Sequence, residues 1–351
     1  MGPGWGIVGT GAIAARFAVA CHSMGRPAVA VVSRQQETGD AFAQRFGLSG
    51  GTVSSIADLA AHPNVGAVYI ATPNATHHDI ALECIAGGLP VLCEKPLACT
   101  AAQARAIADA ASAANVFCME GLWSLCLPTL RTALSAVRRG DIGELREVHG
   151  SFAVPHTSET MPRLFSGEGA GALLDRGVYL LALSQALLGP LSLHHVSGDL
   201  NAEGVDLAAT LLLENATGAR AVLSCAIDRM GDNRLTLVGT QGRITFDAPV
   251  SNPSGYRLRR ADPTVPFSGP TGLPGSKQKL KALVTNRPGL RRVGKALLEN
   301  VTGAPGDLSD QIRHVESCLA QNLTQSDLVP LEGSITVLEL IDAARARLKP
   351  G

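Results

Sequence analysis

The stretch from Trp5 to Ala14, WGIVGTGAIA, decides the fold because it joins an apolar strand, a glycine-rich turn and the start of a helix. Gly9 allows the tight bend, Gly11 lets the backbone approach a ligand, and the small Ala14 lets helix and strand pack closely. The helix then directs its free N–H groups at an anion. In this context the motif favours a pyrophosphate site over a plain loop. The expected contacts are Gly9, Thr10, Gly11, Ala12 and Ile13.

Short apolar runs alternate with helical patterns from this stretch to about Glu120. Because the runs do not alternate polar with apolar residues, both faces of each strand should be covered, as in a parallel, doubly wound sheet. We therefore expect an α/β Rossmann domain at residues 1–122, with strands at 5–9, 28–32, 66–72, 90–94 and 116–120.

The pattern changes after Leu122. A helical segment and a strand at 145–154 are followed by a proline-containing loop and a long apolar helix from about Ala170 to Leu188. Turn signals such as NATG and TQG then separate several short strands, which predicts hairpins and an antiparallel sheet. Residues 123–351 should thus form an α+β domain with an open, mostly antiparallel sheet. Its outer face needs a cover, which favours a homodimer or homotetramer through that sheet.

Charge and cysteine usage exclude several classes of partner. Lys plus Arg and Asp plus Glu number 30 each, so no basic surface for nucleic acid or an anionic membrane is expected. No apolar run approaches the roughly 20 residues that span a bilayer. The eight cysteines form no C-x-x-C pair and are typical of reduced thiols in a cytoplasmic protein. The adjacent His77 and His78 have no acidic or thiolate partner at ligand spacing, so no metal site is expected.

The end of the second strand indicates which dinucleotide binds. An acidic residue there holds the ribose 2′-OH of NAD, whereas an arginine accommodates the 2′-phosphate of NADP. Ser33 and Arg34 occupy this place, and no carboxylate comes before Glu37. NADP is therefore preferred over NAD, although an arginine on the surface after a strand is also common.

The chain resembles the glucose-fructose oxidoreductase, inositol dehydrogenase and MocA family. Four motifs carry the resemblance in the same order: GIVGTGAIA, ATPNATHHDIALECIAGG, CEKPLA and GALLDRGVY. It extends over most of the chain outside residues 262–305. The segments MEGLWSLCLPTL and RLFSGEGAGALLDRGVY look most like the branch of dimeric dihydrodiol dehydrogenases and NADP-dependent aldose (xylose) dehydrogenases.

The resemblance implies where the cofactor and substrate meet. Its E-K-P motif falls on Glu94, Lys95 and Pro96, commonly with a cis peptide before the proline. The resemblance implies that Glu94, Lys95 and Pro96 contact the cofactor, with Lys95 beside the nicotinamide at the carboxyl edge of the sheet. From the residues alone, a lysine at a strand end with Glu94 as a surface partner is the alternative. The resemblance further implies that Thr72, Pro73, Asn74 and His77 line the ribose and nicotinamide, although Asn74 could equally cap the next helix.

The proton-transfer residue is implied by the motif LLDRGVYLL. Asp175 and Tyr179 are four residues apart, which on a helix brings them to about 40° of each other. By the resemblance, Tyr179 is the general acid/base and Asp175 orients substrate or lysine. We expect Lys95 to pull the pKa of Tyr179 below about 10. A packed core tyrosine with a bonded hydroxyl is the alternative.

One departure bears on the substrate. The branch commonly has arginine and an aromatic residue where WSLCLP places Leu125 and Cys126. Arg163 and Arg176 remain as possible cations near the substrate, with His156 as a further candidate.

We expect an NADP-dependent oxidoreductase that moves hydride to or from a CH–OH carbon of a sugar, polyol or trans-diol. A catalytically silent dinucleotide-binding sensor is the alternative. Residues 262–305 are rich in Pro and Gly and contain the basic patch GLRRVGK. By default we interpret this patch as a basic surface exposed to solvent.

Overall fold

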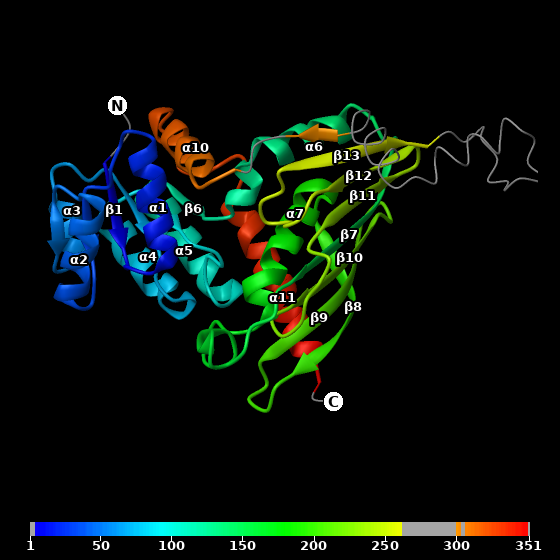
Figure 1. The fold of residues 1–351 in the computed structure, drawn as a ribbon, viewed down its shortest axis with the longest axis horizontal. Helices are drawn as coiled ribbons and strands as arrows, with labels where there is room; N and C mark the ends of the chain where they lie inside the picture. The colour runs from blue at the N-terminus through cyan, green and yellow to red at the C-terminus, as the bar shows by residue number, and fades with distance from the viewer. Residues whose placement is uncertain (1–3, 262–299, 303–305, 350–351) are drawn as a thin grey trace, which may run out of the picture.

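Two β-sheets, each with its own helices, form the computed structural model, which describes residues 4–261, 300–302 and 306–349 (Figure 1). Of 300–302 only the backbone is described. Most of the segment 262–305, and with it the basic patch, lies outside the described residues. The helices and strands of the described residues otherwise follow the order expected from the sequence. The elements that the sequence did not indicate are β3 (Gly51–Val53), β13 (Gly255–Arg260), β14 (Asn300–Thr302), α10 (Ser309–Ala320) and α11 (Leu331–Arg347).

The first sheet is parallel throughout, in the order β3-β2-β1-β4-β5-β6, which confirms the doubly wound fold. Its strands are β1 (Trp5–Val8), β2 (Ala30–Val32), β3 (Gly51–Val53), β4 (Ala67–Ile70), β5 (Val91–Cys93) and β6 (Cys118–Glu120). The helices between them are α1 (Ala12–Ser23), α2 (Gln36–Phe46), α3 (Ile56–Ala61), α4 (His77–Ala86) and α5 (Ala101–Ala114). The edge strand β3 is only half-buried, so its apolar pattern is weak.

Aromatic contacts fix the helix that follows the glycine turn. Phe17 of α1 stacks on Tyr69 of β4 at a centroid distance of 3.8 Å and meets Trp5 of β1 edge-on at 5.2 Å. All three side chains are fully buried. The start of α1 is thereby held at the carboxyl ends of β1 and β4, where open α/β sheets bind ligands.

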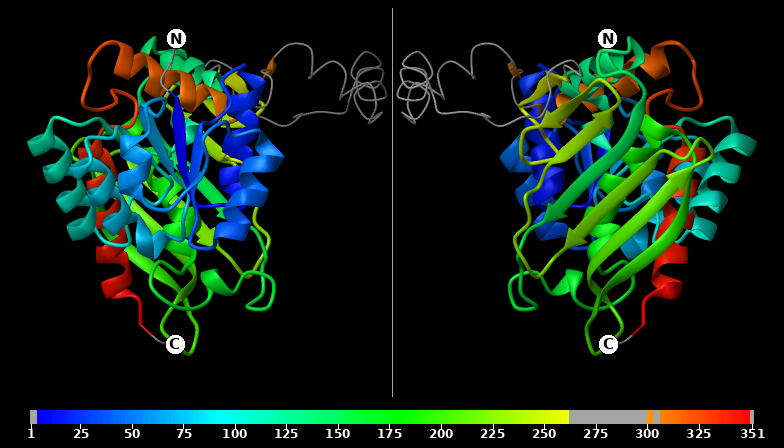
Figure 2. Two further views of the ribbon diagram at one scale, coloured as in Figure 1. Left: turned by 90° about the vertical axis from the view of Figure 1, so that its left-hand side faces the viewer. Right: turned by 90° about the vertical axis from the view of Figure 1, so that its right-hand side faces the viewer.

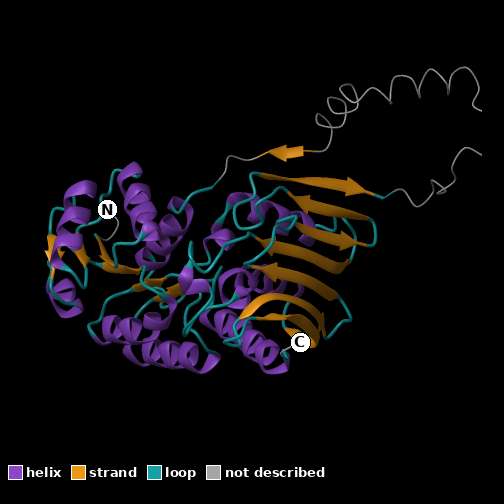
Figure 3. Cartoon of the chain, turned by 60° about the horizontal axis from the view of Figure 1, so that its bottom comes forward, coloured by secondary structure: helices purple, strands orange, loops and turns teal. Residues whose placement is uncertain are grey.

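The second sheet has eight strands in the order β14-β13-β12-β11-β7-β10-β9-β8. Only β10 and β7 pair in parallel among them, so the expectation of a mostly antiparallel sheet is confirmed. The strands are β7 (Leu145–Ala153), β8 (Leu191–Leu200), β9 (Asp206–Asn215), β10 (Arg220–Ala226), β11 (Leu235–Gly239), β12 (Gly242–Phe246), β13 (Gly255–Arg260) and β14 (Asn300–Thr302). Helices cover the face that looks toward the first domain, and no helix of the described residues lies on the outer face (Figures 2 and 3).

The helix beneath this sheet differs from the one expected over Ala170–Leu188. A π-helical turn, η4 (Leu173–Gly177), precedes the α-helix α7 (Val178–Leu188). The entry to this turn is fixed from outside the helix, because Asp206 Oδ2 accepts a hydrogen bond of 2.6 Å from the backbone N–H of Leu173. Such π turns are frequent at functional sites. Asp175 therefore leaves the backbone from a widened turn instead of a regular helix.

The C-terminal segment returns to the first domain before it ends on the second. Helix α10 (Ser309–Ala320) lies beside α1 (Figure 1), where its Glu316 pairs with Arg26 and accepts a hydrogen bond from Trp5 Nε1 at 3.4 Å. Helix α11 (Leu331–Arg347) then packs between α5 and α7. No helix among the described residues is long and apolar enough to cross a membrane.

Candidate active site

The N-terminus of α1 is open and free of competing groups. Gly9 has φ +106°, and a Cβ there would come within 2.7 Å of Ala71 O, so the turn requires glycine. A Cβ on Gly11 would meet no atom within 4 Å. The first turn of α1 has neither an acidic residue nor a side-chain cap, which leaves its N–H groups available to an anion. This arrangement fits the pyrophosphate of a dinucleotide.

At the end of β2, Ser33 is half-buried and Arg34 is exposed. Ser33 Oγ accepts a hydrogen bond from the backbone N–H of Gln35 at 3.4 Å. None of the ion pairs formed by described residues includes Arg34. Its guanidinium is thus available to a phosphate in solution next to the turn.

The E-K-P segment contains a cis peptide between Lys95 and Pro96, as the resemblance implied. Glu94 beside it is buried and bonded on both oxygens: Tyr69 OH donates to Oε1, and the backbone N–H of Lys95 donates to Oε2 at 3.2 Å. Burial raises the pKa of Glu94. Glu94 is therefore not the surface partner of Lys95 but an anchor that holds the segment to β4.

His77 corrects one expectation. Its imidazole is fully buried between two carbonyl oxygens, with Nδ1 2.8 Å from Pro96 O and Nε2 2.9 Å from Thr72 O. Burial lowers its pKa, so the ring stays neutral and donates to one of the two. Without exposed surface, His77 does not line a ligand site in this conformation. It holds the two loops that carry Thr72 and Pro96.

The loop after β4 connects the domains. Thr72 is half-buried, Pro73 is exposed, and Asn74 Nδ2 donates a hydrogen bond of 2.9 Å to Gly169 O in the second domain. No side chain caps α4. The amide of Asn74 thus serves to hold the loop 157–172 over the edge of the first sheet.

Lys95 and Asp175 form a buried ion pair between the domains. Lys95 Nζ lies 3.0 Å from Asp175 Oδ1 and 3.0 Å from the Asp175 backbone oxygen. Burial alone would raise the pKa of Asp175, but nearby cations outweigh it and lower that pKa to about 2. These cations are Lys95, Arg176 and Arg163. Burial opposes the charge of Lys95, but its anionic neighbours raise its pKa on balance.

Tyr179 lies next to this pair, and its acidity differs from the expectation. Its hydroxyl accepts a hydrogen bond of 3.2 Å from Trp123 Nε1, and Lys95 Nζ is 5.2 Å from its ring centroid. The predicted lowering of its pKa is wrong for this conformation: burial raises the pKa more than Lys95 lowers it. The lysine directs its charge at Asp175 instead. Tyr179 is thus a neutral phenol with its own proton still to donate.

Two side chains at this site were not singled out from the sequence. Trp123 belongs to the short helix η2 (Trp123–Cys126), and Arg16 of α1 lies 5.5 Å from the centroid of its ring. Glu120 ends β6 beside Glu94 at the end of β5; it is 1% exposed, and its Oε1 accepts a hydrogen bond of 2.9 Å from Leu97 N. Burial raises the pKa of Glu120 to about 7. Its place at the carboxyl end of a predicted strand was the signal that could have found it.

Leu125 and Cys126, which replace the arginine and aromatic residue common in the branch, contribute to the packing of the protein interior. Both side chains are buried, at 7% and 4% exposure, in a segment that packs against α10. The apolar pair therefore joins η2 to the returning C-terminal segment and leaves no apolar patch facing a substrate.

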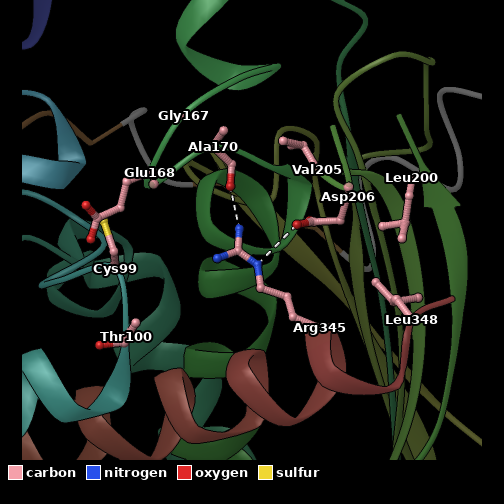
Figure 4. Close-up of a pocket in the computed structure, with 12 residues that line it drawn as sticks. Cys99, Thr100, Gly167, Glu168, Ala170, Leu200, Val205, Asp206, Arg345 and Leu348 are labelled. Atoms are coloured by element: carbon pink, nitrogen blue, oxygen red, sulfur yellow. Dashed lines mark hydrogen bonds and ion pairs between the residues drawn. The ribbon is translucent and has the colours of Figure 1, made fainter. Parts of the chain in front are cut away.

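A cavity of about 270 Å³ lies between the domains, below the loop 157–172 (Figure 4). Arg345 of α11 crosses its wall, where Nε donates to Asp206 Oδ1 at 3.2 Å and a terminal nitrogen donates to Ala170 O. Cys99 and Glu168 lie on the opposite side. None of the residues lining this cavity belongs to the set Lys95, Asp175 and Tyr179.

Comparison with known families adds to this geometry. The model described as "Oxidoreductase family, NAD-binding Rossmann fold" matches residues 4–122, and the GFO/IDH/MocA C-terminal domain matches residues 130–245. The chain belongs to the GFO/IDH/MocA oxidoreductase family. It is thus an oxidoreductase with an NAD(P)-binding Rossmann domain.

The chain is similar to known proteins over nearly its whole length. Trans-1,2-dihydrobenzene-1,2-diol dehydrogenase of Xenopus laevis is 29% identical, covering 98% of this chain and 97% of that protein. The enzyme of the same name from Mus musculus is 28% identical, covering 97% and 95%. Among solved structures, a 3-ketoreductase from Actinomadura kijaniata in complex with NADP and TDP-benzene has a TM-score of 0.78 at 22% identity, covering 100% and 99%. An aldose-aldose oxidoreductase from Caulobacter crescentus has a TM-score of 0.78 at 21% identity, covering 99% and 97%.

Proposed function

We propose that the chain is an NADP-dependent dehydrogenase that transfers hydride between nicotinamide and a CH–OH or carbonyl carbon of a sugar, polyol or trans-dihydrodiol. The observation that carries the proposal is the convergence of Lys95, Asp175 and Tyr179 at the edge of the sheet that also bears the open N-terminus of α1. The names of the relatives, a trans-dihydrodiol dehydrogenase and an aldose-aldose oxidoreductase, support this substrate range.

NADP is proposed over NAD because the end of β2 carries Arg34, which forms no ion pair with any described residue, and carries no carboxylate. The ketoreductase structures that share this fold are complexes with NADP, which supports the same choice. Arg34→Ala should weaken NADPH binding about tenfold or more and NADH binding little, since the lost contact is a charge-assisted one to the 2′-phosphate. Fluorescence titration of both nucleotides measures this. Equal weakening would contradict the phosphate contact.

The residues around Tyr179 supply the proton chemistry. The bound nicotinamide would accept or give the hydride. Lys95 has three N–H donors and uses two on Asp175, so the third can bind a substrate oxygen. Tyr179 accepts from Trp123 and keeps its own proton, which it can give to a carbonyl oxygen during reduction. Oxidation requires the phenolate, and because the Tyr179 pKa is raised, the oxidation rate should increase with pH toward that pKa.

Tyr179→Phe tests the proposal. The variant removes the proton donor and keeps the ring, so kcat should fall about 10²- to 10⁴-fold while NADP affinity stays unchanged. Tyr256→Phe is the matched control, because Tyr256 is another buried tyrosine, on β13 in the second sheet. Nicotinamide absorbance with aldoses, inositols and trans-diols gives the rate. A Tyr179→Phe enzyme as fast as the parent would contradict the assigned role, and tight NADPH binding without any turnover would favour the sensor.

We also propose a homodimer or homotetramer through the outer face of the second sheet. Leu212 of β9 and Val222 of β10 are cross-strand neighbours on that face, exposed to 38% and 39%. Light scattering should find more than one chain per particle, and Leu212→Lys with Val222→Lys should shift the particle toward a monomer. A monomeric parent protein would contradict this.

The proposed location is the cytoplasm. All eight cysteines are free and buried, which is typical of a reducing compartment. Cell fractionation with an antibody to the protein would test it.

A further inference from the structure

We propose that the substrate carries an anionic group, a carboxylate or a phosphate, which Arg176 and Arg163 bind beside the reacting carbon. This inference rests on the proposed function, since it concerns the substrate class of the same site.

Arg176 holds a guanidinium at the site with most of its donors unused. One terminal nitrogen lies 3.1 Å from His156 Nε2, the single hydrogen bond described for this group. Its Nε is 3.2 Å from Asp175 Oδ2, an ion pair without hydrogen-bond geometry, and this buried Nε has no hydrogen-bond partner among the described residues. A guanidinium offers five N–H donors, so further acceptors are needed.

The position of Arg176 suits an anion on the same small molecule as the reacting hydroxyl. Its guanidinium lies 4.8 Å from the centroid of the Phe152 ring, and Phe152 in turn meets Tyr179 edge-on at 5.6 Å. A single aromatic side chain thus separates the guanidinium from the phenol. The Arg176 side chain keeps 17% exposure, which leaves part of the fork open to a ligand.

Arg163 adds a second cation on the loop above the site. It is exposed, it follows Met161 and Pro162 in the short helix η3 (Pro162–Leu164), and its charge lowers the pKa of Asp175. None of the ion pairs formed by described residues includes Arg163. The backbone oxygen of Leu164 accepts a hydrogen bond of 3.0 Å from the N–H of Gly171, which ties the segment that carries Arg163 to the chain leading into the turn of Asp175. Arg163 is therefore available to an anionic ligand at this place.

The described carboxylates of the site already have partners, and Glu120 accepts from the backbone N–H of Leu97. Asp175 is shared between Lys95 and Arg176, and Glu94 is bonded to Tyr69 and the backbone. An uncharged diol could accept hydrogen bonds from the guanidinium through its hydroxyl oxygens, but it would bring no negative charge to these cations. A carboxylate or phosphate would accept from the fork in bidentate geometry.

Ligand binding to an inactive variant tests this inference independently of the proposed catalytic activity. Dissociation constants for matched pairs, glucuronate against glucose and glucose 6-phosphate against glucose, are measured by calorimetry on the NADP complex of Tyr179→Phe at fixed ionic strength. We expect at least one charged probe to bind about tenfold to a hundredfold more tightly than glucose. The carboxylate and phosphate arms distinguish the two anions.

Substitutions of the two arginines in the Tyr179→Phe variant test whether they cause the preference for the charged probes. Arg163→Gln and Arg176→Gln should each reduce the ratio of charged to neutral affinity about tenfold, and Arg176→Lys should restore part of it by keeping the charge without the fork. Arg105→Gln is the matched control, because Arg105 is an exposed arginine on α5 that pairs with Glu332 and Glu339 away from the site.

Either of two results overturns the inference: no charged probe binds more tightly than glucose, or the preference survives both Arg163→Gln and Arg176→Gln. Neither result touches the proposed function, which fails separately if the parent enzyme reduces NADP with no member of the alcohol panel and with neither glucuronate nor glucose 6-phosphate.

Discussion

Two buried aspartates of the second domain each face a cation, one inside the candidate site and one outside it, and they differ in their electrostatics. Asp175 pairs with Lys95 at 3.0 Å, and the surrounding cations lower its pKa to about 2. Asp206 pairs with Arg345 at 3.2 Å, yet burial raises its pKa because this one arginine, 30% exposed, does not compensate for the lost hydration. A short distance between opposite charges therefore does not define the state of a buried carboxyl. Of these two carboxyls, the one with more cations around it has the lower pKa.

The two pairs also differ in what they hold. Asp206 and Arg345 bind the backbone of Leu173 and Ala170, at the entry of the π-helical turn. Asp175 lies in that turn and holds Lys95. The Asp206 pair thus supports the backbone, whereas the Asp175 pair positions an ammonium for chemistry.

Lys95→Met should have the largest effect and should separate the two pairs most clearly. Loss of the ammonium removes a charge that acts on the substrate oxygen, so we expect kcat/KM to fall about 10³-fold, or about 4 kcal/mol. Arg176 still neutralises Asp175, so the free energy of unfolding should change much less. Steady-state kinetics and urea denaturation measure both, with Lys349→Met as the control at an exposed lysine. A fully active Lys95→Met enzyme would show that the Lys95–Asp175 pair, like the Arg345–Asp206 pair, only supports the structure.

Gly171→Ala should break the supporting pair. Gly171 has φ +107°, and a Cβ there would lie 2.3 Å from Asp206 Oδ1 and 2.9 Å from an Arg345 nitrogen. We expect a loss of about 3 kcal/mol of unfolding free energy from strain and the displaced pair. Gly189→Ala is matched, because Gly189 has φ +75° with no atom near its Cβ, and should cost about 1 kcal/mol. Equal losses would show that the backbone angle alone matters.

As the pH falls, protonation of the two aspartates should change the free energy of unfolding in opposite directions. The pKa of Asp175 is lower in the folded state, so its stabilisation of about 2 kcal/mol is present above pH 4 and is lost as the pH falls toward 2. The pKa of Asp206 is raised, so proton uptake by Asp206 favours the folded state as the pH falls through that raised pKa. Asp175→Asn should therefore flatten the loss of stability between pH 4 and 2, whereas Asp206→Asn should remove a gain of stability that arises above pH 4, as the pH falls from the raised pKa toward the ordinary value. Urea midpoints from pH 7 to pH 2 measure both, and two variants that change the curve in the same direction and pH range would contradict the difference.

Local sequence patterns predicted the fold where short-range chemistry determines it. The glycine turn, the strand ends at Thr72 and Glu94, and the DRGVY segment all depend on neighbours within a few residues. The roles of other residues depend on contacts that are remote in sequence: His77 lies between two loops, Glu120 holds Leu97, and Trp123 reaches Tyr179. The pKa of Tyr179 could not be predicted because it depends on burial, which no spacing reveals.

The return of α10 to the first domain means that this domain is discontinuous along the chain. Glu316 binds Arg26 and Trp5, and Gln325 forms a bridge with Cys118 at the end of the sheet. A fragment that stops at residue 122 would lack this cover and expose the apolar surface beneath it. A fragment that joins residues 4–122 to 306–327 would keep this cover, and any closing motion of the domains would have to bend the chain at three crossings: after residue 122, before residue 306 and after residue 327.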